Sequence, residues 1–392
     1  MDVILDLRNR VAEKLKSYHI DDILFYISFL TYLIVNFLLG TMYIYVIDTS
    51  LLYGIWLSAC FVALIKVGLF NIYHSWKDMG LVVGIGLIIW VSCLNTNSWD
   101  MIYYYVMIIA AQDMKFKNIV KIFLVTLVVM LIFTFISAKL GIIVGMTNMR
   151  DGSTDLRYAL GTVYPTDLAA RLFYIELFYI VLRKFKLTLP EYVIWMTVIA
   201  FGYIVTNTRL DAILMVMILL TVLLKKQVIN FLEKLKFTGI SVISAAIISF
   251  IIGITYLYKP HNFLLDKIDH LLSGRLRFGH IAFERFNVPF FGQVVPQVGN
   301  GGLHKHTYEY FYIDCSYIRV LMMNGLFSFL ILMIVLFWMI HYFLDAKAYT
   351  LLLALLFVLL SSVIDQHLLE ISFDCILLTL FSNITYFKER LE

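Results

Sequence analysis

Long apolar stretches recur along almost the whole chain, and no other sequence feature limits its fold as strongly. Segments long enough to cross a hydrocarbon core of about 30 Å lie approximately at residues 23–47, 50–69, 79–95, 99–113, 118–146, 166–183, 190–206, 209–224, 238–258, 316–342, 349–364 and 367–387. Hydrophobic residues make up 61% of the 392 residues and charged residues only 15%, which is too apolar for a soluble domain. The sequence therefore predicts an all-α, polytopic membrane protein with about twelve transmembrane helices, and the shortness of some stretches leaves a count of about ten or eleven open.

The chain shows no sign of a division into separately folding parts. It has five prolines and no Ser/Gly-rich stretch or repeat that would act as a linker, so residues 1–392 are expected to form a single membrane domain. Three non-membrane segments are predicted: a cytoplasmic interfacial helix at 1–22, a first long external loop at 147–165 and a large external loop at 259–315.

Lysine and arginine are unevenly distributed between the two sides of the predicted helices. With the N-terminus in the cytoplasm, basic residues occupy every short inner loop, as the positive-inside rule requires, and both termini are then cytoplasmic. The outer basic residues are confined to segments 139–171 and 259–319 and to Arg209. A basic cluster on the outer side calls for an anionic ligand, and a lipid head group is the obvious candidate.

The large external loop is predicted to contain two helices. Apolar residues recur at helical spacing from Phe263 to Leu272, a pattern typical of a helix resting on the membrane surface. After Ser273-Gly274 a second helix is expected from Arg275 to Phe286, with Pro289 beyond its end. Segment 291–302, with its glycines and a proline, is expected to be irregular.

Four arginines in the outer segments are candidate ligands for a diphosphate. Arg275 and Arg277 lie at the start of the second loop helix, where free backbone N–H groups and the positive end of the helix dipole favour an anion. A guanidinium group can also bind phosphate oxygens bidentately. Arg209 lies in a very short outer turn, where either an anionic ligand or Asp211 would balance its charge, and Arg157 lies in the first long loop.

The first long loop leads into a predicted helix. Three further charged residues of this loop are Arg150, Asp151 and Asp155. Pro165 suits the first turn of the helix that follows. Asp167 and Arg171 are spaced i,i+4 on that helix and are expected to form a local ion pair.

Several residues on the outer side could accept a proton, namely His280, Glu284, His304, His306 and Asp314. On a helix, His280 and Glu284 share a face with Arg277, so an acid–base group and an anion clamp can face one cleft. Pairing of the loop arginines with Glu284 or with lipid head groups is the purely structural alternative. The His304-Lys305-His306 pattern has no carboxylate partner nearby, so neither a metal nor another cofactor is predicted.

Missing motifs narrow the functional classes. The chain has no GxxxxGK[ST] loop and no G-x-G-x-x-G after a strand, which argues against an ATP-driven pump or a cytoplasmic sugar-nucleotide transferase. Nothing indicates a nucleic-acid partner. The four cysteines form no CxxC pair and are expected to pack as small buried hydrophobes.

Three groups of residues occur in the order of a known family's motifs. They are Leu160-Gly161-Thr162-Val163-Tyr164-Pro165-Thr166-Asp167-Leu168-Ala169, then Thr206-Asn207-Thr208-Arg209, then a series formed by Leu272-Ser273-Gly274-Arg275, Phe291-Gly292, Asp314-Cys315-Ser316-Tyr317-Ile318-Arg319-Val320-Leu321 and Asn324-Gly325-Leu326. In order, spacing and membrane placement they resemble the motifs of bacterial Wzy-type O-antigen, capsular and exopolysaccharide repeat-unit polymerases, which belong to the O-antigen polymerase and ligase superfamily. Thr166-Asp167 and Cys315 depart from that pattern, where Pro-Asn and Asn are common.

The resemblance implies a GT-C-like helical fold and an inverting glycosyl transfer outside the bacterial cytoplasmic membrane. The growing glycan would leave undecaprenyl diphosphate and join the next lipid-linked repeat unit. Arginines are suited to the negative charge that develops on the leaving diphosphate. Arg275 and Arg209 are therefore expected at the diphosphates, Arg157 and Arg277 in support, and His280 or Asp314 as the base.

Other functions stay open at this level. An O-antigen-ligase-type transferase would share the same motifs but move finished glycan to another acceptor. A lipid-linked oligosaccharide flippase or transporter is the alternative from a different class, although its charges would more naturally lie within the membrane spans. The expected partners are undecaprenyl-diphosphate-linked oligosaccharide, membrane lipids and, in the polymerase case, a chain-length regulator protein.

Overall fold

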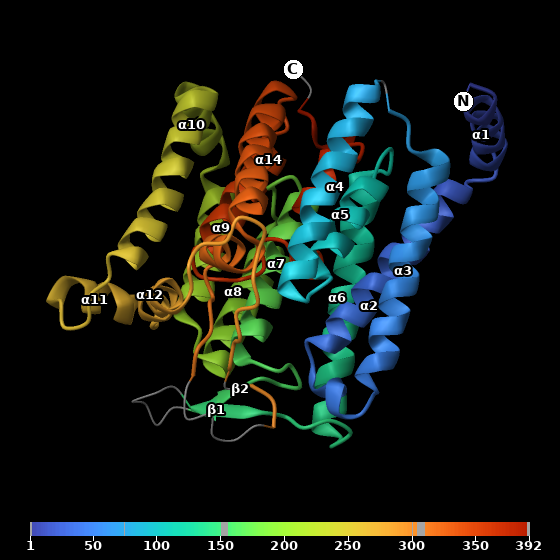
Figure 1. Ribbon diagram of the computed structural model, residues 1–392. Helices are drawn as coiled ribbons and strands as arrows, with labels where there is room; N and C mark the ends of the chain where they lie inside the picture. The colour runs from blue at the N-terminus through green and yellow to red at the C-terminus, as the bar shows by residue number, and fades with distance from the viewer. Residues whose placement is uncertain (1, 74, 150–155, 300, 304–309, 390–392) are drawn as a thin grey trace.

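The computed structural model describes residues 2–73, 75–149, 156–299, 301–303 and 310–389, and it is mostly helical. Its α-helices are α1 (Asp2–Lys16), α2 (Ile20–Leu39), α3 (Thr49–Phe70), α4 (Trp76–Thr96), α5 (Asp100–Ala110), α6 (Phe116–Lys139), α7 (Pro165–Leu182), α8 (Leu189–Thr206), α9 (Arg209–Leu223), α10 (Lys225–Tyr256), α11 (Phe263–Leu271), α12 (Arg275–Arg285), α13 (Ser316–Arg319), α14 (Leu326–Asp345) and α15 (Tyr349–Ser361). The long helices run roughly side by side, whereas α11 and α12 lie across their direction (Figure 1).

Seven helices of the described residues are long and apolar enough to cross a membrane, namely α2, α3, α4, α6, α8, α10 and α14. Their outward faces carry many exposed apolar side chains, such as Phe61 on α3, Leu87 on α4 and Phe250 on α10. Apolar side chains on an outer surface are what a hydrocarbon solvent requires. These are the features of a helical membrane protein, as the sequence predicted.

The remaining helices of the bundle are shorter or more polar than a simple membrane span. Helices α5 and α15 have only 11 and 13 residues. Helix α7 carries three charged residues, Asp167, Arg171 and Glu176, and all three are buried inside the protein. Nearly every residue of α7 and α15 is buried, so these two helices form the centre of the molecule. The predicted count of about twelve spans is therefore not confirmed, since seven helices of the described residues are long and apolar enough to cross a membrane.

The predicted last span, residues 367–387, is wrong. This part of the chain forms turns and two short 3₁₀ helices, Ile376–Leu380 and Thr385–Phe387. Its backbone groups bond to the connection between α5 and α6, where Asn383 N–H donates to the Met114 carbonyl (2.7 Å) and the Asn383 carbonyl accepts from Phe116 N–H (3.0 Å). Irregular backbone is tolerated inside a membrane protein only where such protein partners replace the missing helix bonds.

Helix α10 starts earlier than the predicted span but is interrupted. Lys236 has non-helical backbone angles (φ 54°, ψ −178°), so a separate helical segment precedes the one that matches the predicted 238–258 span. At the start of the chain, α1 occupies most of the predicted interfacial segment 1–22.

Both helices predicted in the large loop are present, as α11 and α12, with ends within a residue of those expected. The α11 residues Phe263, Leu264 and Leu271 leave about 70% of their surface exposed. In the first long loop, strands β1 (Thr147–Met149) and β2 (Leu156–Tyr158) pair in antiparallel fashion, which the sequence did not predict.

Two glycines of the motif series fold the large loop back onto the bundle. Gly292 and Gly325 both have positive φ (96° and 91°). A Cβ atom on Gly325 would lie 2.4 Å from the backbone nitrogen of Gly292. The two backbone segments that contain these glycines are therefore too close together for a side chain at position 325. Gln293 N–H donates to the Met323 carbonyl at 2.9 Å across the same contact.

The predicted inner and outer segments lie toward different ends of the molecule. Helix α1 and the C-terminal end of the described chain lie at the same end, at the top of Figure 1, while the β1–β2 hairpin lies at the bottom and α11 and α12 lie in the lower half. This separates the predicted inner segments from the predicted outer ones. The predicted outer segments therefore gather in one half of the molecule.

Candidate functional site

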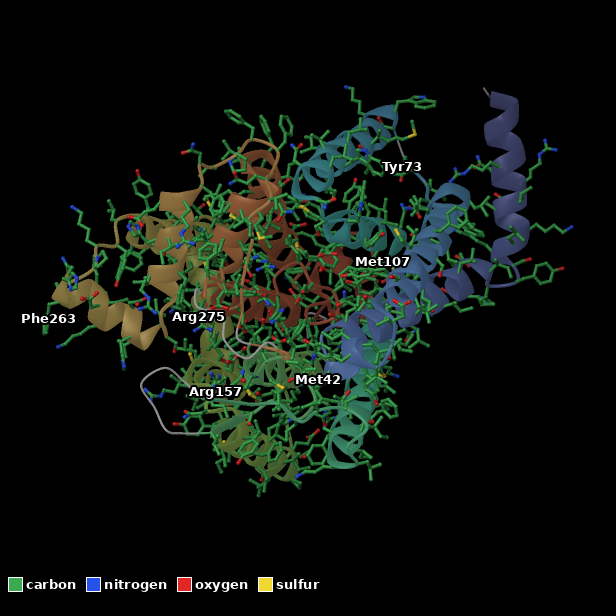
Figure 2. All side chains as sticks on the ribbon, turned by 60° about the horizontal axis from the view of Figure 1, so that its bottom comes forward. Met42, Tyr73, Met107, Arg157, Phe263 and Arg275 are labelled. Atoms are coloured by element: carbon green, nitrogen blue, oxygen red, sulfur yellow. The ribbon has the colours of Figure 1, made fainter. Side chains whose placement is uncertain are left out.

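A cavity of about 710 Å³ lies among the predicted outer segments. It is lined by residues from the hairpin (Asn148, Arg157), the start of α7 (Tyr164, Pro165, Thr166, Asp167), the start of α9 (Thr208, Arg209, Leu210, Asp211), the region of α11 and α12 (Tyr258, Asp266, Asp269, His270, Ser273, Gly274, Arg275, Arg277, Phe278), the end of the large loop (Tyr310, Tyr312, Asp314) and the segment after α15 (Asp365, Gln366, His367). Figure 2 shows Arg157 and Arg275 on the same side of the molecule, with Phe263 further out at the tip of α11. All four arginines proposed from the sequence, and Asp314, thus line one cavity.

Three helices begin at this cavity. Helix α7 starts at Pro165, as the sequence predicted, α9 at Arg209 and α12 at Arg275. The N-terminal residues of α7 and α9 receive no side-chain capping bond, since neither Tyr164 nor Thr208 caps its helix. Uncapped N-termini present backbone N–H groups and partial positive charge, which suits an anion.

Helix α12 differs from the expectation at its start. Its first N–H groups, those of Leu276 and Arg277, donate to Oδ1 of Asp269 at 2.9 and 3.0 Å. Asp269 therefore caps α12, and the predicted anion site on these N–H groups is occupied by the protein's own carboxylate. What remains available to a ligand at this end of α12 is the arginine side chains.

Arg275 is fixed in place by backbone carbonyls. Its Nε donates to the Ile364 carbonyl at 2.5 Å and its Nη1 to the Leu272 carbonyl at 3.0 Å. Burial by itself would lower the pKa of Arg275, yet neighbouring carboxylates, Asp314 first, raise it above its ordinary value. Arg275 is therefore a permanent cation held at the cavity wall in one orientation.

The side chains of Arg209 and Arg277, unlike that of Arg275, are not fixed by hydrogen bonds within the described residues. Both side chains are exposed, and within the described residues neither guanidinium group forms a hydrogen bond or an ion pair. The local pairing of Arg209 with Asp211 that the sequence left open is not formed. Two guanidinium groups at the cavity thus keep their donors available for a ligand.

Arg157 is positioned by the hairpin. In the β1–β2 pairing it stands opposite Asn148, and its Nε donates to the Thr206 carbonyl at 2.6 Å. That bond connects the first long loop to the end of α8, one short turn before Arg209. The two-residue turn Asn207-Thr208 therefore separates the residue that binds Arg157 from Arg209.

Six carboxylic acids also line the cavity, namely Asp167, Asp211, Asp266, Asp269, Asp314 and Asp365. Two of them have structural partners, because Asp269 caps α12 and Asp266 accepts a hydrogen bond from the Tyr258 hydroxyl at 2.9 Å. In contrast, Asp211 Oδ1 and Asp365 Oδ2 are buried and have no hydrogen-bond partner within the described part of the chain. The Asp211 and Asp365 carboxyl groups lie close enough to interact with each other, so the two form an acidic pair at the cavity wall.

Asp314 lies between charged neighbours at the cavity wall. Burial raises the pKa of Asp314 above its ordinary value, and the charge of Arg275 opposes that rise. The tyrosines Tyr310 and Tyr312 line the cavity beside it, and burial raises the pKa of both hydroxyls, which therefore remain protonated donors. The cavity wall thus combines cations, carboxylates and aromatic rings.

The structure does not bring His280 to the cavity. Its Nδ1 lies 3.1 Å from the Tyr256 carbonyl and its Nε2 lies 3.3 Å from Oε1 of Glu284, and its ring packs edge-to-face against Tyr258, which lines the cavity while His280 does not. The predicted shared cleft for Arg277, His280 and Glu284 is therefore not formed. His304, His306, Arg150, Asp151 and Asp155 lie outside the described residues.

The predicted ion pair between Asp167 and Arg171 is also absent. Arg171 is fully buried, and its guanidinium lies between the rings of Phe37 (4.1 Å) and Phe373 (4.0 Å). Its Nη1 donates weakly to the Ser372 carbonyl at 3.4 Å. The aromatic sandwich takes the place of the carboxylate because the segment after α15 packs onto this face of α7.

The sequence-based interpretation missed the contribution of the segment after α15. Asp365, Gln366 and His367 line the cavity, although this stretch was assigned to a short outer turn and a membrane span. A signal was present in the three consecutive polar residues that end an apolar run. Within the described residues, no group of three or more His, Cys, Asp or Glu side chains is arranged to hold a metal ion.

The fold and the site define a helical membrane protein with a charged cavity at one end. No protein-family model matches the chain. No curated protein and no solved structure matches it either. The function therefore has to be argued from the cavity itself.

Proposed function

We propose that the protein is a membrane glycosyltransferase that polymerises oligosaccharide repeat units carried on undecaprenyl diphosphate. In this proposal the growing glycan leaves its diphosphate and joins the next lipid-linked repeat unit, with inversion at the anomeric carbon. The enzyme would have a GT-C-like architecture in the bacterial cytoplasmic membrane. Both termini would be cytoplasmic, and the cavity would open on the extracytoplasmic side.

The observation that carries the proposal is the convergence of four arginines and two uncapped helix starts on one cavity. Cleavage of a glycosyl diphosphate leaves negative charge on the phosphate oxygens, and preorganised cations stabilise that charge as it develops. Arg275 is held by two carbonyls, while Arg209 keeps all its donors available. The pair thus offers one rigid and one adaptable contact to the phosphates.

The remaining wall suits the sugar part of such a substrate. Carboxyl groups such as those of Asp314 and Asp365 line it, and Tyr164, Tyr310 and Tyr312 supply rings and hydroxyls. A glycan offers many hydroxyl donors and apolar ring faces, so it matches both kinds of group. A simple inorganic anion would match only the arginines.

The direct test uses purified protein in detergent and a defined lipid-linked repeat unit. We expect chains of several repeats from the wild type, because no transport can occur without a membrane. Arg209→Ala and Arg275→Ala should abolish chain growth, whereas the matched control Lys267→Ala should not, since Lys267 lies on α11 outside this cavity. Failure of the wild type to lengthen any repeat unit would refute the proposal.

The same assay separates the neighbouring activities. Transfer of a preformed chain to a different acceptor, without growth of the chain, would identify a ligase. Binding of the lipid-linked unit without any bond formation in detergent, together with its movement across reconstituted vesicles, would identify a flippase. In cells, loss of the polymerase should leave single repeat units, and a chain-length regulator would change only the length distribution.

A further inference from the structure

His367 is a cavity-lining histidine with a carboxylate partner. It lies in the irregular segment after α15, and only 3% of its surface is exposed. Its Nδ1 is in short contact with Oε2 of Glu370, which also forms an ion pair with it when the ring is protonated. The carboxylate accepts the Nδ1 proton, which leaves the lone pair of the neutral ring on Nε2. Among the described residues Nε2 has no hydrogen-bond partner.

The plane of the His367 ring is fixed by stacking. The ring lies 3.6 Å from that of Phe373 with an interplanar angle of 9°. The guanidinium of Arg171 lies 4.0 Å from the same Phe373 ring, so the two groups must occupy its opposite faces. Phe37 covers the other side of Arg171 at 4.1 Å. The result is a buried column of four groups that ends in His367 at the cavity wall.

The segment that carries this column is itself tied to the bundle. The Ser372 hydroxyl donates to the side-chain carbonyl of Asn36 on α2 at 2.5 Å. Ser316 on α13 donates through its hydroxyl to the Asp365 carbonyl at 2.5 Å. Anchors on both sides of His367 keep the imidazole from turning away from the cavity, which is the preorganisation a catalytic group needs.

We propose that His367, oriented by Glu370, is the general base that takes the proton from the acceptor hydroxyl of the incoming repeat unit. This inference rests on the proposed function and adds to it the group that activates the acceptor. Nε2 removes the hydroxyl proton as the acceptor oxygen forms its bond to the anomeric carbon. The anomeric carbon–oxygen bond to the diphosphate breaks at the same time, and its electron pair leaves on the phosphate oxygen. The imidazolium then passes its proton to water or to the released diphosphate.

The two residues that the sequence offered as the base, His280 and Asp314, are less suitable than His367. His280 forms a similar pair with Glu284, yet both of its ring nitrogens lie near protein oxygens and it does not reach the cavity. Asp314 does line the cavity, and burial raises the pKa of its carboxyl group against the opposing charges of Arg275 and Arg319, but among the described residues no side-chain hydrogen bond orients it. His367 alone of these three candidates combines access, an available nitrogen and an orienting carboxylate.

The charges around His367 come from several elements. The charged groups that face it or its partner Glu370 are Asp365 in the same segment, Asp167 and Arg171 on α7, Asp314 at the end of the large loop, Arg319 on α13 and Asp100 on α5. The hydroxyls of Tyr32 on α2 and Tyr104 on α5 also lie near Glu370. The carboxylates favour the protonated ring and the arginines oppose it. Removal of the Glu370 carboxylate takes away the closest negative charge, so it should make the ring easier to deprotonate.

The test measures initial rates of chain growth by the full-length protein across a range of pH. His367→Gln should lower kcat by about 10²–10⁴-fold with little change in KM, since general base catalysis contributes about that much. Glu370→Gln should lower kcat less and shift the acidic limb of the pH–rate profile to lower pH. Retained binding of undecaprenyl diphosphate shows that each variant is folded.

The chain offers a matched control in its second His–Glu pair. His280→Gln and Glu284→Gln should leave both kcat and the acidic limb unchanged. A His367→Gln rate equal to that of His280→Gln would overturn the proposal while leaving the polymerase function intact. If His367→Gln does not fold, Glu370→Gln decides, because an unshifted acidic limb overturns the proposal. A wild type that forms no polymer would instead refute the proposed function.

Discussion

The side chain of Arg275 and the carbonyl of Ile364 are joined by a hydrogen bond of 2.5 Å, although the two residues lie 89 positions apart in the sequence. This bond ties the second helix of the large loop to the segment after α15. Because Asp365 is the next residue after Ile364 and His367 lies two residues beyond it, the same contact positions the arginine and this part of the cavity wall. Loop helix α12 is therefore part of the site and not a cover over it.

Arg275 and Arg209 should respond differently to substitution. Arg275→Ala leaves the carbonyls of Ile364 and Leu272 without a donor, so it should cost about 1–3 kcal/mol of stability as well as activity. Arg209→Ala breaks no bond within the described residues and should change stability by about 0.5 kcal/mol at most. Unfolding midpoints in detergent, measured beside transfer rates, test this. Equal destabilisation by both changes would contradict the different roles.

Asp269 should act as a helix cap and not as a catalytic acid. Asp269→Ala removes the acceptor for the Leu276 and Arg277 N–H groups and should cost about 0.5–2 kcal/mol. Asp269→Asn keeps a side-chain oxygen in the same place and should retain most of the stability and the transfer activity. Thermal unfolding of the two variants gives the comparison. Loss of activity in a stable Asp269→Asn protein would show that the charge itself is needed.

Gly40 should tolerate no side chain, because Arg171 cannot move aside. A Cβ atom on Gly40 would lie 2.9 Å from Nη2 of Arg171, whose guanidinium is held between two phenyl rings. Gly40→Ala should therefore destabilise the protein by about 1–3 kcal/mol. Gly54→Ala is the matched control, since a Cβ on that α3 glycine meets nothing within 4 Å. Similar unfolding midpoints for the two variants would show that Arg171 is free to move.

Asp314→Asn should change how stability depends on pH. Since the pKa of Asp314 is raised in the folded protein, the folded state holds this proton more tightly than the unfolded chain does. The contribution of Asp314 to stability is then largest below about pH 4 and declines as pH rises toward the raised folded value. Asparagine does not ionise, so the variant should gain in unfolding midpoint relative to the wild type as pH increases from 4 to 7. A constant difference between the two proteins over that interval would contradict the raised pKa.

Local patterns in the sequence predicted the helices well. The apolar runs gave the membrane-crossing helices, and the spacing from Phe263 to Leu272, followed by Ser273-Gly274, gave both helices of the large loop. Proline at the first position of α7 fixed its start. These features depend on residues within a few positions of one another, which is why the chain alone reveals them.

The apolar pattern gave a wrong prediction where an apolar segment folds irregularly inside the protein and does not form a membrane-spanning helix. Residues 367–387 are apolar enough to suggest a span, but they lie inside the protein and bond to the turn between α5 and α6. Hydropathy cannot distinguish a segment surrounded by lipid from one surrounded by protein, because both environments are apolar. His367 and Asp365 were missed for the same reason.

The sequence by itself determined that this is a helical membrane protein and named the arginines of its outer segments as candidate ligands. Only the tertiary structure decided that Arg157, Arg209, Arg275 and Arg277 line one cavity, that Asp269 occupies the start of α12, and that His367 rather than His280 reaches the site. Helix formation follows from local backbone hydrogen bonds and apolar periodicity. The cavity depends on contacts between residues far apart in the chain, and these form only when the helices pack.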